Sequence, residues 1–67
     1  MGVSIHPLAV VHPNAELGAD AVVGPFCMVG ENVRLGDRVV LRSHVSVEGH
    51  TTLGAGCEVW PFASVGG

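Results

Sequence analysis

The stretch LGADAVVGPFCMVGENVRLG, residues 17–36, repeats a pattern every six residues, in which an aliphatic residue is followed by glycine. The aliphatic spacing extends in both directions through the chain. A period of six matches neither the 3.6-residue face of a helix nor the alternation of a free strand, so it predicts a supersecondary unit that stacks on itself. The aliphatic residues in this phase are Ile5, Val11, Leu17, Val23, Val29, Leu35, Leu41, Val47, Leu53, Val59 and Val65.

The other positions of the hexad also hold distinct residue types when the aliphatic residue is taken as position one. Position two is rich in glycine, which tolerates positive φ and favours sharp bends. Every proline (Pro7, Pro13, Pro25 and Pro61) falls at position three. Proline has no N–H to donate, so this position should lie outside the hydrogen-bonded ladder. We therefore expect the corners at positions two and three.

The remaining residues of each hexad predict a short strand, from position four to the next aliphatic residue. Alternate side chains of a strand face the same way, so position five should point inward beside position one. All residues at position five are small or medium, and one larger and one small residue per side fill a narrow section densely. They are Ala9, Ala15, Ala21, Cys27, Val33, Val39, Val45, Thr51, Cys57 and Ala63.

Three such sides close one coil of 18 residues, and successive coils stack as parallel strands about 4.8 Å apart. The predicted fold is all-β: a parallel β-helix, or hexapeptide-repeat solenoid, shaped as a triangular prism of about three coils and one further side. The period does not determine its hand, and the general rule for parallel crossovers favours the right-handed sense.

Residues 1–67 are expected to form a single domain, because a chain of this length has room for one small core. A repeat array exposes its interior and its strand edges unless its ends are capped. The sequence stops at Val65-Gly66-Gly67 with no closing helix and no polar cap. We expect it to be the N-terminal part of a longer chain.

Composition argues against several classes of partner. The net charge is −3 and the fixed cations are Arg34, Arg38 and Arg42, so there is no basic stripe for nucleic acid. The apolar residues are dispersed and never form the long run that a membrane span needs, and no secretory signal is present. A cytoplasmic protein is expected.

The two cysteines, Cys27 and Cys57, both fall at the small inward position but on different sides of the prism. The sequence has neither a Cys-x-x-Cys motif nor a Cys/His spacing typical of zinc sites. Both are predicted to be free core thiols, and neither a metal nor a cofactor is expected.

Outward residues differ between the three sides, and only one side carries an apolar ridge. Exposed apolar surface on a soluble protein usually marks a partner, so we predict a homotrimer that forms through this ridge. The alternative is a loop or helix, absent from this chain, that covers it. The ridge residues are Leu8, Phe26, His44 and Phe62, flanked by Val10, Met28, Ser46 and Ser64. The second side presents Asn14, Glu16, Asn32, Arg34, His50 and Thr52, and the third Asp20, Val22, Arg38, Val40, Gly56 and Glu58.

The four histidines form two pairs, His6 with His12 and His44 with His50, each separated by one hexad. The members of a pair should lie on neighbouring sides and diverge, so neither pair can grip a metal within one subunit. His44 is interpreted as a packed interface residue, since surface histidines commonly titrate without catalytic duty. We predict no catalytic, cofactor-binding or metal-binding residue.

Three segments resemble a known family: residues 24–30 (GPFCMVG), residues 41–54 (LRSHVSVEGHTTLG) and residues 61–66 (PFASVG). In the second segment Arg42 and Glu48 replace the usual glycines beside a Ser-His-Val and a Gly-His-Thr motif. Together with the opening Ile5-His6-Pro7, these segments are similar to the N-terminal coils of the acyl-carrier-protein:UDP-N-acetylglucosamine O-acyltransferases of lipid A biosynthesis.

The resemblance implies a left-handed, trimeric β-helix with active sites between subunits. It also implies transfer of a 3-hydroxyacyl group from acyl carrier protein to the sugar 3-hydroxyl of UDP-N-acetylglucosamine, the first step of lipid A biosynthesis. In this family a histidine from later coils acts as general base on that hydroxyl. Neither that histidine nor the family's Gln-Asp-Leu-Lys-Tyr segment is present, so the resemblance implies a scaffold that is inactive alone.

Two alternatives stay open. The chain could belong to another hexapeptide-repeat enzyme, such as the N-acyltransferase of the same pathway, a serine acetyltransferase or a γ-type carbonic anhydrase, the last of which needs three convergent zinc ligands. It could instead be a non-enzymatic β-solenoid scaffold. An ice-binding wall is disfavoured because Thr52 is the one threonine expected to face outward.

Overall fold

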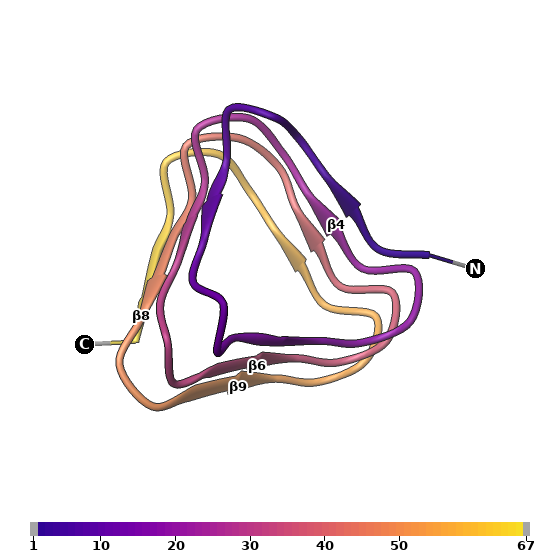
Figure 1. Ribbon diagram of the computed structural model, residues 1–67. Coiled ribbons are helices and arrows are strands. Elements are labelled where there is room, and N and C mark those ends of the chain that lie inside the picture. Colours follow the sequence, from indigo (N-terminus) through magenta and orange to yellow (C-terminus); the bar gives the residue numbers. More distant parts are fainter. Residues whose placement is uncertain (1, 67) are drawn as a thin grey trace.

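The computed structural model describes residues 2–66, which form short parallel strands in three sheets. We call these sheets walls A, B and C; seen along the stack, they form the three sides of a triangular outline (Figure 1). Wall A contains β1 (Ser4–Ile5), β4 (Val22–Val23), β7 (Val40–Leu41) and β10 (Glu58–Val59). Wall B contains β2 (Val10–Val11), β5 (Met28–Val29), β8 (Ser46–Glu48) and β11 (Ser64–Gly66), and wall C contains β3 (Glu16–Leu17), β6 (Val33–Leu35) and β9 (Thr51–Leu53).

Strand pairing follows the 18-residue coil predicted from the hexads. On wall A, Val22 pairs in parallel with Ser4 on one side and with Val40 on the other. The strands β1 to β9 make three coils, and β10 and β11 supply two walls of a fourth, where the sequence had predicted one further side. The all-β solenoid is thus confirmed. Residues 2–66 contain no helix, and therefore none that could cross a membrane.

The core lies between the walls of the middle coils and is built from hexad positions one and five, as predicted. Every fully buried hydrophobic side chain comes from one of these two positions, because both point into the prism. No buried polar or charged residue is found among residues 2–66. The buried residues are Ala21, Val23, Cys27, Val29, Val33, Leu35, Val39, Leu41, Val45 and Val47.

The corners lie at positions three and four of the hexad, so the prediction of positions two and three was wrong by one residue. Most strands cover only positions six and one, and the chain turns at positions three and four. Positive φ falls mainly at position four, for example 59° at Asp20 and 78° at Gly56. The N–H of the following residue donates to the position-two carbonyl, as from Ala21 to Gly18 (3.4 Å). Proline at the second residue and positive φ at the third residue of such a turn are typical of type II turns.

Position-two glycines have a different role from the one expected. The N–H of Gly24 donates to the carbonyl of Leu41 (2.8 Å), so this position still belongs to the ladder. A Cβ added to Gly24 would collide with the carbonyl oxygen of Arg42, and one added to Gly36 would lie 2.6 Å from the amide nitrogen of Ala55. These glycines are therefore needed for the close approach of adjacent coils.

Candidate functional site

Three aromatic rings stack along the corner that joins wall A to wall B. The ring of His44 lies between Phe26 and Phe62, with centroids 5.0 and 4.9 Å apart and ring planes within 23° and 19° of parallel. Each ring comes from a different coil, because the three residues occupy the same hexad position. Stacked arrangements at these separations are favourable for aromatic pairs. The prediction that His44 lies in one ridge with the two phenylalanines is confirmed.

The backbone at this corner adopts a conformation that bulky residues rarely accept. Phe26, His44 and Phe62 have φ of 61°, 53° and 65°. The corner between walls C and A uses the same geometry at Asp20 and Arg38, so positive φ belongs to the turn itself. Aspartate is a common choice in this region of φ, whereas a large ring there costs free energy. Aromatic residues at the positive-φ position of the turn therefore distinguish the corner between walls A and B from the corner between walls C and A.

Hydrogen bonds between coils hold the stacked residues in place. The N–H of His44 donates to the carbonyl of Pro25 (3.1 Å), and the N–H of Phe62 donates to the carbonyl of Ser43 (3.4 Å). Each donor lies one coil beyond its acceptor. These hydrogen bonds fix the backbone positions of the stacked residues.

This corner and the adjoining face of wall B expose a continuous apolar surface. Phe26 is 54% exposed and Phe62 is 80% exposed, and Leu8 lies in the same column. On wall B, Val10 and Met28 are also exposed. We keep the name ridge for Leu8, Phe26, His44 and Phe62. An exposed apolar band of this kind marks an interaction surface more often than an isolated exposed side chain does.

A second group of large side chains extends the corner toward wall A. The guanidinium of Arg42 lies 4.7 Å from the centre of the Trp60 ring, and its Nε donates to the Glu58 carboxylate (2.6 Å). Arg42 is thus paired with neighbouring side chains on wall A. Trp60 was not recognised from the sequence. The available signal was its place at position two, where glycine is usual.

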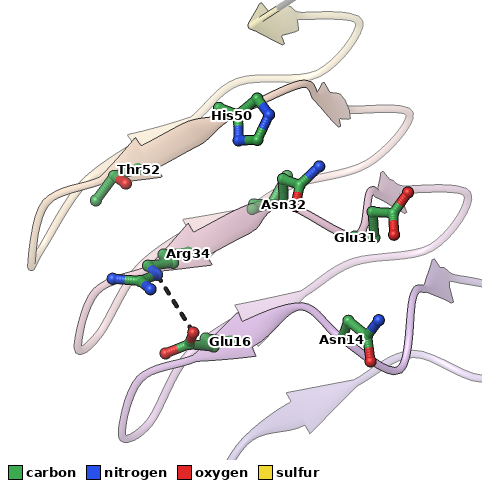
Figure 2. A pocket seen from close by; sticks show the side chains of 8 residues that line it. Asn14, Glu16, Glu31, Asn32, Arg34, His50 and Thr52 are labelled. Atoms are coloured by element: carbon green, nitrogen blue, oxygen red, sulfur yellow. Dashed lines mark ion pairs between the residues drawn. The ribbon is translucent and has the colours of Figure 1, made fainter.

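Wall C presents a polar hollow instead of an apolar band. Figure 2 shows side chains from three successive coils lining it, and its volume is about 440 Å³. Glu16 and Arg34 form an ion pair of 3.2 Å, and both side chains are about two-thirds exposed, so the pair contributes little to stability. The lining residues are Asn14, Glu16, Glu31, Asn32, Val33, Arg34, His50 and Thr52.

The histidines outside the ridge do not converge. His6 Nδ1 accepts a hydrogen bond from the Leu8 N–H, and His12 Nδ1 accepts one from the Asn14 N–H, both at 3.1 Å. Each ring therefore braces its own corner turn, while His50 lines the hollow on wall C. Across residues 2–66, no three His, Cys, Asp or Glu side chains are grouped closely enough to hold a metal ion.

The two thiols differ, contrary to the prediction that both lie in the core. Both cysteines are free, but Cys27 is buried whereas Cys57 is exposed. Cys57 does occupy position five, where the side chain points inward. It is exposed because it precedes β10, on which no further strand of residues 2–66 is stacked.

The fold and its repeat agree with a known protein family. A family model described as bacterial transferase hexapeptide (six repeats) matches residues 14–49. The chain belongs to this family.

One solved structure resembles this hexapeptide transferase chain closely. It is that of the Arabidopsis UDP-N-acetylglucosamine acyltransferase, with 47% sequence identity and a TM-score of 0.91 over 92% of the chain. The chain spans 22% of the length of that enzyme. A comparison with curated protein sequences gave no match.

Proposed function

We propose that these coils are the scaffold of an O-acyltransferase. In this proposal the enzyme moves a 3-hydroxyacyl group from acyl carrier protein to the 3-hydroxyl of UDP-N-acetylglucosamine, in the cytoplasm, as the first step of lipid A biosynthesis. The observation that supports it most strongly is the similarity to the Arabidopsis acyltransferase, at 47% identity and a TM-score of 0.91.

The contribution of these coils to the reaction is structural. A general base must lie within hydrogen-bonding reach of the proton that it removes and be free to accept it. In the described residues, the Nδ1 atoms of His6 and His12 accept hydrogen bonds from turn amides. His44 lies at the corner of walls A and B and His50 lines the hollow on wall C, so these two imidazoles do not converge on one site. We therefore assign no catalytic residue to this chain and expect the chain alone to be inactive.

A chimera tests the proposal. Residues 5–65 replace the matching coils of the Arabidopsis UDP-N-acetylglucosamine acyltransferase, and acyl transfer from acyl carrier protein to UDP-N-acetylglucosamine is measured. We expect the chimera to keep kcat/KM within about tenfold of the parent enzyme, because matching coils would hold the catalytic residues in place. Coils that displaced those residues by about 1 Å would lower the rate by about 100-fold. A chimera with Leu41→Asp serves as the control that cannot fold.

Two outcomes would contradict the proposal. A chimera that folds with the parent's circular dichroism spectrum and oligomeric state but transfers no acyl group would exclude the scaffold role. Measurable ester formation by the 67-residue chain alone would show that it carries catalytic residues of its own.

We also propose that the chain associates as a homotrimer through the ridge. The supporting observation is the exposed apolar band formed by Leu8, Phe26 and Phe62 with Val10 and Met28. The substitution Phe26→Asp places a charge in the band and should shift sedimentation from trimer to monomer. Asp20→Asn, a change at another corner, is the matched control; an unchanged sedimentation coefficient for Phe26→Asp would argue against this interface.

A further inference from the structure

The ridge needs a receiving surface that differs from itself. This inference rests on the proposed homotrimer. In a closed ring of three copies each pairwise interface is heterologous, so a ridge that lies away from the threefold axis meets a different patch on the next copy. We propose that the ridge of one copy binds in an apolar groove at the opposite edge of wall B of the next copy, with Phe26 over Gly30 and His44 facing Glu48.

The groove lies where wall B turns toward wall C. Its volume is about 240 Å³, and aliphatic side chains of the first three coils make most of its surface. His12 stands at one end and Glu48 at the other, with Gly30 on the coil between them. The lining residues are Val10, His12, Met28, Val29, Gly30, Val47 and Glu48.

Gly30 differs from the other glycines that occupy hexad position two in the middle coils. A Cβ added there would lie 3.5 Å from the Val47 carbonyl oxygen, an ordinary contact distance, and no positive φ is recorded at this residue. Gly24 and Gly36, by contrast, have no room for a Cβ because the adjacent coil lies against them. Packing within the chain does not require glycine at position 30. Because Gly30 has no side chain, it leaves a gap between His12 and Glu48 along the stack. This gap is open to the outside and one coil high.

Symmetry brings this gap to the height of a ridge ring. Ridge and groove both run along the stack of coils, so they meet over several coils only if the trimer axis is parallel to the stack. Rotation about such an axis leaves the height of each coil unchanged. Phe26 and Gly30 belong to one coil, and His44 and Glu48 belong to the next. Each ring of the ridge therefore faces the position-two residue of its own coil in the neighbouring copy.

Hydrogen-bonding complementarity supports the same pairing. Within residues 2–66, the Glu48 carboxylate has one partner, the Ser46 hydroxyl at 3.2 Å. The His44 ring has stacking partners above and below, so its nitrogens lie at the rim of the stack. An imidazole N–H can donate to a carboxylate, and complementary polar groups across an interface fix its register.

Disulfide cross-linking tests the contact between Phe26 and Gly30. Phe26→Cys and Gly30→Cys are combined in a Cys57→Ser background, and we expect a covalent trimer on a non-reducing gel after mild oxidation. A bond within one chain is excluded, because four residues of extended strand span about 13 Å, whereas bridged Cα atoms lie within about 7 Å. The control pair, Phe26→Cys with Gly54→Cys, uses the same hexad position at the corner between walls C and A and should stay uncrosslinked.

An exchange of the two side chains tests the second contact. His44→Glu and Glu48→His should each raise the trimer dissociation constant by about tenfold, which corresponds to about 1.4 kcal/mol. The double variant should return to within about threefold of the original dissociation constant, because it restores an imidazole opposite a carboxylate. Sedimentation equilibrium measures all three proteins.

The outcomes separate this inference from the proposals beneath it. A trimer that forms no cross-link between positions 26 and 30 would overturn the receiving groove and leave the trimer standing. A chain that sediments as a monomer at every concentration would overturn both. Neither result bears on acyl transfer by the chimera, which tests the scaffold proposal separately.

Discussion

Leu41 and Ile5 occupy the same hexad position on the same wall, yet Leu41 is fully buried and Ile5 is 44% exposed. The difference arises because Leu41 has a coil on each side of it, whereas Ile5 lies in the first coil. The same contrast separates Cys27 from Cys57, and Gly24 from Gly54. In this solenoid the place in the hexad sets the direction of a side chain, and the place along the stack sets how much its burial contributes to stability.

The largest difference is expected for truncation of the aliphatic column. Leu41→Ala should lower the free energy of unfolding by about 2 to 5 kcal/mol, because it removes buried methyl groups and leaves a cavity. Ile5→Ala should cost about 1 kcal/mol or less, since Ile5 is already partly solvated. Urea denaturation followed by circular dichroism measures both. Equal losses would mean that the first coil is as tightly packed as the middle ones.

A smaller difference in stability is expected between two glycines that both occupy hexad position two. Gly24→Ala should cost about 2 to 4 kcal/mol, because the new Cβ collides with the carbonyl of Arg42 and the coils must separate. Gly54→Ala should be neutral or stabilise by up to about 1 kcal/mol, since nothing lies within 4 Å of its Cβ and alanine restricts the unfolded chain. Thermal denaturation distinguishes the two. A destabilised Gly54→Ala would contradict an open position there.

The middle and end rings of the stack should differ in their contribution to the free energy of unfolding by about 1 kcal/mol or less. His44→Ala removes the middle ring and both stacking contacts, whereas Phe62→Ala removes an end ring and one contact. At about 0.5 to 1.5 kcal/mol for a stacked pair, with the lower values at exposed sites, His44→Ala should cost about twice as much as Phe62→Ala. Denaturation of the two variants in the same buffer gives the ratio. A larger loss for Phe62→Ala would show that its single contact outweighs the middle of the stack.

The last comparison leaves stability unchanged and concerns the rate at which the thiols react. Cys57 should react with a thiol reagent as fast as an unstructured cysteine, because it is exposed. The thiol of Cys27 should react at least about 100-fold more slowly than that of Cys57, because it becomes accessible only when the middle coils open. Mass spectrometry of the labelled protein over time measures both rates. Equal rates would mean that the middle coils open as easily as the end.

The six-residue period was sufficient to predict the solenoid, its inward columns and the residues of each outer wall. Strand alternation decides side-chain direction locally, so a residue such as Met28 or Arg34 can be assigned to a face from its place in the hexad. The corners were less predictable. Proline at position three was interpreted correctly. Glycine at position two was attributed to a turn, although Gly18, Gly24 and Gly36 are needed for the close approach of the next coil.

The direction of each side chain follows from the local sequence, because it depends on the few residues around it. The stacking of coils, in contrast, sets which inward side chains are buried and which glycines have no room for a Cβ, and it places Arg42 over Trp60. Each of these depends on a neighbour one coil away, 18 residues distant in sequence. A period along the chain predicts that such a neighbour exists, but not whether it is present at the end of the stack or how closely it approaches.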